Sequence, residues 1–98
     1  MNTLILLAAI ASHPPAESAM LYATVTPRNT SQVVTYQVTA TVPVLVRVST
    51  SAATVTRRHR AGQWRARVIV RGSGRVDVRV YGRASGQLLV ATAYEVEP

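Results

Sequence analysis

Apolar and polar residues alternate along most of this chain, from Leu21 almost to the C-terminus. Successive side chains of a strand point to opposite faces of a sheet, so this alternation predicts half-buried β-strands. Turn-forming residues interrupt the alternation at short, regular intervals, and no segment has the period of an amphipathic helix. The pattern predicts strands over residues 21–26, 32–41, 44–49, 53–56, 64–70, 76–80 and 87–96.

Seven short strands in about eighty residues are typical of an immunoglobulin-like or fibronectin-like β-sandwich. The sequence therefore predicts an all-β fold: a single seven-stranded antiparallel sandwich with an apolar N-terminal arm. Residues 20–98 are predicted to form the sandwich, and residues 1–19 the arm with its Pro-rich linker. A chain of 98 residues has no room for a second domain.

Three of the later strands each have one face that is suited to the core. These inner sets are predicted to be Trp64, Ala66, Val68 and Val70; then Val76, Val78 and Val80; and finally Leu88, Val90 and Tyr94. The valines must stay on one side, because a slip of one residue would move every side chain to the opposite face.

Arginines surround the turn-like segment Gly72-Ser73-Gly74 at nearly every second position. Glycines accept positive φ, so the segment is predicted to close a hairpin between residues 64–70 and 76–80. A register that keeps the valines together then sets arginines opposite one another in two pairs, Arg67 with Arg79 and Arg71 with Arg75.

This hairpin is predicted to carry an arginine face made of Arg65, Arg67, Arg71, Arg75 and Arg79. Like charges directly opposite each other cost up to about 1 kcal/mol per pair, and salt reduces that cost. One interpretation is a solvated outer face that discourages aggregation; the other is a cationic surface for an acidic partner. A second basic cluster, Arg57, Arg58 and Arg60, is predicted to lie in a loop.

Composition extends this interpretation. The net charge is +7, and every basic residue other than histidine is an arginine. Arginine forms bidentate contacts with anions, although a GC-rich genome also favours arginine over lysine. The chain has no cysteine, which excludes disulfides, thiolate nucleophiles and cysteine-bound zinc.

Catalysis finds little support in the sequence. The acidic residues and histidines are few and scattered, with no metal-ligand spacing and no nucleophile elbow. We therefore predict no enzyme activity, no catalytic residue, no metal and no cofactor. Nucleic acid is not favoured as a partner, because the arginines are not interleaved with aromatic residues that bases could stack on, and no nucleic-acid-binding motif is present.

The N-terminal segment contains an unbroken apolar run from Leu4 to Ala11. It is much shorter than the about 20 residues that span a bilayer. Three interpretations are open: an arm that packs on a partner, an export signal with the small-x-small pattern Ala9-Ile10-Ala11, or a segment of no consequence upstream of a true start at Met20. The predicted contact residues of an arm are Leu4, Ile5, Leu6, Leu7 and Ile10.

The stretch Val34-Thr35-Tyr36-Gln37-Val38-Thr39 resembles the actinobacterial MmpS-like family, as do the Trp64 strand, the glycine turn and the segment Ala84-Ser85-Gly86-Gln87. The resemblance implies a small β-sandwich outside the membrane that accompanies lipid transporters. The chain departs from that family in lacking cysteines and a full membrane helix. It also resembles immunoglobulin-like accessory domains on the capsids and tails of actinobacteriophages.

The sequence thus predicts a non-catalytic structural or attachment module of a larger assembly, in first place a phage virion accessory protein that decorates a capsid or tail. It would dock on an acidic protein through the arm and the arginine face, and be oligomeric through the assembly. The alternative is an exported, MmpS-like accessory protein at the cell envelope that binds anionic lipid or cell-wall components; only this alternative involves a membrane.

Overall fold

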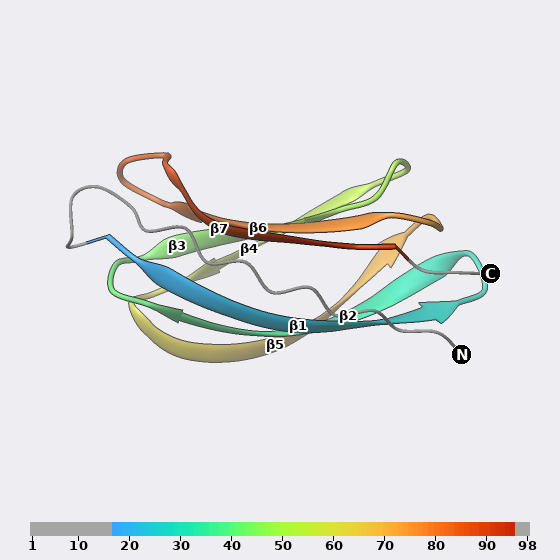
Figure 1. The fold of residues 1–98 in the computed structure, drawn as a ribbon, viewed down its shortest axis with the longest axis horizontal. Helices are drawn as coiled ribbons and strands as arrows, with labels where there is room; N and C mark the ends of the chain where they lie inside the picture. Colours follow the sequence, from blue (N-terminus) through green and yellow to red (C-terminus); the bar gives the residue numbers. More distant parts are fainter. Residues whose placement is uncertain (1–16, 96–98) are drawn as a thin grey trace.

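The computed structural model describes residues 17–95, which form seven strands in two stacked sheets (Figure 1). The first sheet has the order β1-β2-β5, with β1 (Ala19–Arg28), β2 (Ser31–Ala40) and β5 (Gly62–Arg71). The second has the order β4-β3-β6-β7, with β3 (Val44–Ser49), β4 (Thr54–His59), β6 (Val76–Gly82) and β7 (Leu88–Tyr94). Every pairing is antiparallel, and residues 17–95 contain no helix, so the predicted all-β sandwich is confirmed.

The strand order identifies the variant of the sandwich. In an immunoglobulin constant-type domain the fourth strand extends the sheet of strands one, two and five. Here β4 pairs with β3 and extends the other sheet, which is the fibronectin-like arrangement. Three hairpins stay within a sheet, and the connections after β2, β4 and β5 cross from one sheet to the other.

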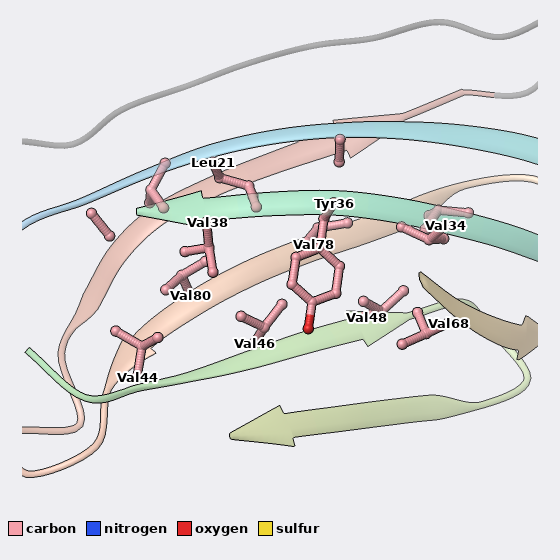
Figure 2. Close-up of a cluster of buried hydrophobic side chains, with 14 of the residues drawn as sticks. Leu21, Val34, Tyr36, Val38, Val44, Val46, Val48, Val68, Val78 and Val80 are labelled. Atoms are coloured by element: carbon pink, nitrogen blue, oxygen red, sulfur yellow. The ribbon is translucent and has the colours of Figure 1, made fainter. Parts of the chain in front are cut away.

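The core between the sheets consists mainly of valine. Alternate residues of β2, β3 and β6 point inward, and their valines are almost completely buried. β-branched side chains suit this pleated surface, where they lose little rotamer freedom. Since the chain has no phenylalanine, the ring of Tyr36 supplies aromatic bulk among valines from both sheets (Figure 2).

The inner face of β7 differs from the predicted set of Leu88, Val90 and Tyr94. A bulge shifts the pairing between β6 and β7, so that Val80 faces Val90 whereas Tyr81 faces Leu88. The extra residue, Leu89, is completely buried, and Leu88 is 37% exposed. Strict alternation had placed these two leucines on the wrong faces, because a bulge reverses the parity of every residue beyond it.

The prediction that Trp64 belongs to the core is also wrong, since its side chain is 39% exposed. Val68 and Val70 are buried and Ala66 is partly buried, as the parity of the strand predicts. Trp64 lies near the start of β5, opposite Val38 at the side of the sandwich rather than over its middle.

The remaining predictions about domain limits concern the ends of the chain. β1 begins at Ala19, slightly before the predicted strand. The arm residues Leu4, Ile5, Leu6, Leu7 and Ile10 lie outside the described residues, as does the end of the predicted last strand at Val96. Within residues 17–95 no helix is long and apolar enough to cross a membrane.

Candidate functional site

The structure divides the predicted arginine face between two sheets. β5 pairs with β2, and β6 pairs with β3 and β7, so β5 and β6 do not form a hairpin. The predicted pairs of Arg67 with Arg79 and of Arg71 with Arg75 are therefore wrong. The alternation determines which face of a strand a side chain occupies. The same valines are buried whether the two strands form a hairpin within one sheet or lie in two sheets that face each other. The pattern alone does not identify the neighbouring strand.

The glycine segment after β5 is a crossover between the sheets. Gly72 and Gly74 have positive φ, as predicted, but the tight packing of Gly72 reflects the crossover. Its N–H donates to the Thr30 carbonyl at 2.8 Å, and a Cβ on Gly72 would lie 2.5 Å from Thr50 Oγ1. The close approach of three strand ends thus requires glycine at this position.

The outer surface of β1, β2 and β5, which we call the three-stranded face, carries four arginines, Arg28, Arg65, Arg67 and Arg71. All four are exposed. Their neighbours on the central strand are short and polar: Arg65 faces Gln37, Arg67 faces Thr35, and Arg71 faces Ser31. No two arginines face each other across hydrogen-bonded strands here, so the predicted cross-strand repulsion is absent from this face.

Short side chains along β2 leave a depression between the taller residues of β1 and β5. One hollow of about 610 Å³ is lined by Thr26, Pro27, Arg28, Val33, Thr35 and Arg67. A second of about 180 Å³ is lined by Tyr22, Thr24, Thr35, Tyr36, Gln37 and Arg65. Both hollows share Thr35, and each has a guanidinium group from β5 on its border. Hydroxyl and amide groups line the floor beside these cations.

Tyr22 is a residue of this face that the sequence analysis did not single out. It is 56% exposed and lies in one cross-strand row with Gln37 and Arg65. Met20 and Ile69 are also exposed on this face. The parity of β1 would have identified Tyr22, since Leu21, Ala23 and Val25 form the buried set of that strand.

No acidic side chain lies on the three-stranded face. The described residues contain only three acidic side chains, Glu17, Asp77 and Glu95. Arg75 binds two of them, with its Nε 3.2 Å from Asp77 and its Nη1 3.7 Å from Glu95. Glu17 accepts a hydrogen bond from Ser85. Within residues 17–95, the arginines other than Arg75 thus have no ion pair.

The outer surface of the second sheet, which we call the four-stranded face, has a different arrangement. Arg47 of β3 lies directly opposite Arg79 of β6. The Arg47 Cζ is 5.2 Å from the centre of the Tyr81 ring. A side-chain hydrogen bond with Tyr81, the largest cause, and the negative charge of Asp77 raise the pKa of Arg79. Tyr81 thus interacts with both arginines.

The basic run after residue 56 lies mostly in a strand, and the prediction of a loop is wrong. Arg57, Arg58 and His59 belong to β4, and only Arg60 lies in the turn that follows. Charged residues fit this strand because β4 is at an edge and is mostly exposed. Arg58 shares the outer side with Leu45, and Arg57 and His59 point toward the seam between the sheets.

His59 links the two sheets at this seam. Its Nε2 lies 2.7 Å from the Tyr36 hydroxyl, and its ring stacks on Trp64 at a centroid distance of 5.7 Å. The indole N–H of Trp64 donates to the Arg60 carbonyl at 2.8 Å. Burial, and secondarily the charge of Arg57, lower the pKa of His59. These contacts explain Trp64 as part of a clasp between β4 and β5.

Two further features of residues 17–95 concern ligand binding. A hollow of about 440 Å³ at one end of the sandwich is lined by Glu17, Val42, Pro43, Gly82, Arg83 and Ala84. Residues 17–95 contain no group of three or more histidine, aspartate or glutamate residues that could hold a metal ion. Most of the arginines that have no ion pair within residues 17–95 therefore lie on the two outer faces.

Comparisons of the chain with protein-family models, curated proteins and solved structures found no match. The resemblances to MmpS-like proteins and to phage accessory domains therefore stay predictions.

Proposed function

We propose that this chain is a non-catalytic attachment module that docks on an acidic protein surface of a larger assembly through its three-stranded face. One observation carries the proposal: four exposed arginines lie on this face, three of them at the border of its hollows, and none has an ion pair within residues 17–95. Potentials of opposite sign across an interface favour the correct partner and accelerate association.

The other side chains of the face support a protein partner. Protein interfaces are enriched in arginine, tyrosine and methionine, and depleted in lysine, glutamate and aspartate. The face combines its arginines with exposed Tyr22, Met20 and Ile69, and it has no acidic side chain. A single tyrosine offers too little stacking surface for single-stranded nucleic acid, which uses successive aromatic platforms.

A virion remains the assembly that we propose, with the protein as a capsid or tail accessory domain. The support is that a small cysteine-free sandwich with a cationic outer face is suited to binding on the surface of an assembled particle. The apolar arm would add a second contact on the same assembly, either by packing in a groove or by adding a strand.

The experiment measures binding to immobilised poly-L-glutamate, which presents the carboxylates of an acidic protein surface. We compare the unchanged protein with the triple variant R65Q/R67Q/R71Q at several salt concentrations. An exposed charge pair contributes about 0.5 kcal/mol, so losing three should weaken binding about tenfold and flatten its salt dependence.

The matched control is R57Q/R60Q/R83Q, which removes the same charge outside the two outer faces. It should bind within about twofold of the unchanged protein, because these arginines do not reach the docking surface. An equal loss of affinity for poly-L-glutamate in both variants would show that binding depends only on net charge, and would overturn the proposal. Binding to phosphatidylglycerol vesicles without binding to poly-L-glutamate would overturn it as well, in favour of the envelope alternative.

A further inference from the structure

Arg47 and Arg79 form a cationic pair, and neither of them has an ion pair within residues 17–95. They face each other on adjacent hydrogen-bonded strands, where like charges are unfavourable. The acidic residue of β6, Asp77, forms its ion pair with Arg75, although its charge also acts on Arg79. Tyr81 interacts with both arginines. Such a pair is arranged for an anion that comes from outside the chain.

The pair points away from the three-stranded face. Arg47 and Arg79 lie on the outer side of β3 and β6, whereas Arg65, Arg67 and Arg71 lie on the outer side of β5, and the core separates the two layers (Figure 1). Because the two sheets enclose one core, their outer sides face in opposite directions. A flat acidic surface that contacts one face does not reach the other.

We infer that the four-stranded face is a second carboxylate-binding surface, centred on Arg47, Arg79 and Tyr81, and that one molecule bridges two acidic protein surfaces. The inference rests on the proposed function of the three-stranded face and extends it from attachment to cross-linking. Arginine–carboxylate contacts suit this geometry, because two exposed arginines occupy directly opposite positions on adjacent strands.

The first measurement asks whether the four-stranded face binds. The triple variant R65Q/R67Q/R71Q should keep a weaker affinity for poly-L-glutamate. Adding R47Q/R79Q to it should reduce this residual affinity at least about tenfold, which corresponds to about 1.4 kcal/mol. Adding R60Q/R83Q removes the same charge from turns and should change it less than about twofold. Circular dichroism verifies that all variants are folded.

The second measurement asks whether one molecule joins two surfaces. Light scattering should show that the unchanged protein clusters carboxylate-coated particles, and that a large excess of protein disperses them, because each particle is then saturated. R65Q/R67Q/R71Q and R47Q/R79Q should each bind single particles and fail to cluster them, whereas R60Q/R83Q should cluster them normally.

The outcomes separate the two proposals. If the unchanged protein does not bind poly-L-glutamate, the proposed function itself fails. If it binds, but the residual affinity does not depend on Arg47 and Arg79, the second surface is refuted and the first remains. Clustering by either one-face variant at the level of the unchanged protein also overturns bridging.

Discussion

Two tyrosine hydroxyls connect the sheets at opposite sides of the sandwich. Tyr94 of β7 donates to the Ala23 carbonyl of β1 at 2.6 Å, and Tyr36 of β2 contacts His59 of β4 at 2.7 Å. Burial raises the pKa of each phenol to about 12. Both hydroxyls therefore stay protonated at neutral pH. Side-chain contacts at these two seams thus join the sheets, in addition to the apolar core.

The contact of Tyr36 with His59 predicts an effect of acid on stability. The pKa of His59 is lowered by folding, so the unfolded chain binds a proton more readily. This histidine costs no stability above its unfolded pKa of about 6.5, and stability is lost as the pH falls from there through the lowered folded pKa. We expect the thermal midpoint, followed by circular dichroism, to decrease between about pH 7 and pH 5.

Two variants locate this acid effect. His59→Gln should remove the decrease, because no imidazole then titrates at the seam. His13→Gln removes the only other histidine of the chain and serves as the control. A thermal midpoint that does not change with pH in the unchanged protein, or that still decreases with acid in His59→Gln, would contradict the assignment to His59.

At the scale of strands, the bulge in β7 predicts very different losses of stability for two adjacent leucines. Leu89→Ala should reduce the free energy of unfolding by about 2 to 5 kcal/mol, because it leaves a cavity among buried side chains. Leu88→Ala should cost less than about 1 kcal/mol, since Leu88 is on the outer side. Urea denaturation measures both values. A larger loss for Leu88→Ala would mean that β7 follows strict alternation after all.

The number of strands and most of their inner faces were predictable from the sequence, because burial imposes a period of two. Two local features were not. A bulge such as that before Val90 inserts one residue without a distinctive sequence signal, and a polar edge strand such as β4 has the composition of a loop. Pairing with β3, rather than composition, decides that Arg57 and Arg58 belong to a strand.

The candidate site was predictable only in part. Parity placed Arg65, Arg67, Arg71 and Arg79 outward, and the structure confirms that all four are exposed. Grouping them into one face required the neighbour of β5, which depends on contacts between segments distant in the chain. Residues 72–74 satisfy the requirements of a tight turn as well as those of a crossover, so the local sequence does not distinguish the two.

For the whole molecule, the uncompensated arginines predict that salt stabilises the fold. Raising the ionic strength from about 0.01 M to about 0.15 M shortens the Debye length from about 30 Å to about 8 Å and screens repulsion. We expect the thermal midpoint to increase over this range. Arg47→Gln removes the pair of arginines that lie directly opposite each other on β3 and β6, and should reduce the increase more than Arg60→Gln does. A midpoint that falls with salt would indicate net attraction instead.

The edge position of β4 has a consequence for the lifetime of the protein. This strand is hydrogen-bonded to one neighbour only and buries little of its surface, so it can detach while the core remains folded. It also contains adjacent arginines, after which trypsin-like proteases cut. Local detachment, and not global unfolding, would then set how quickly such a protease degrades the chain. A partner that covers the outer side of β4 would protect the protein from digestion without changing its fold.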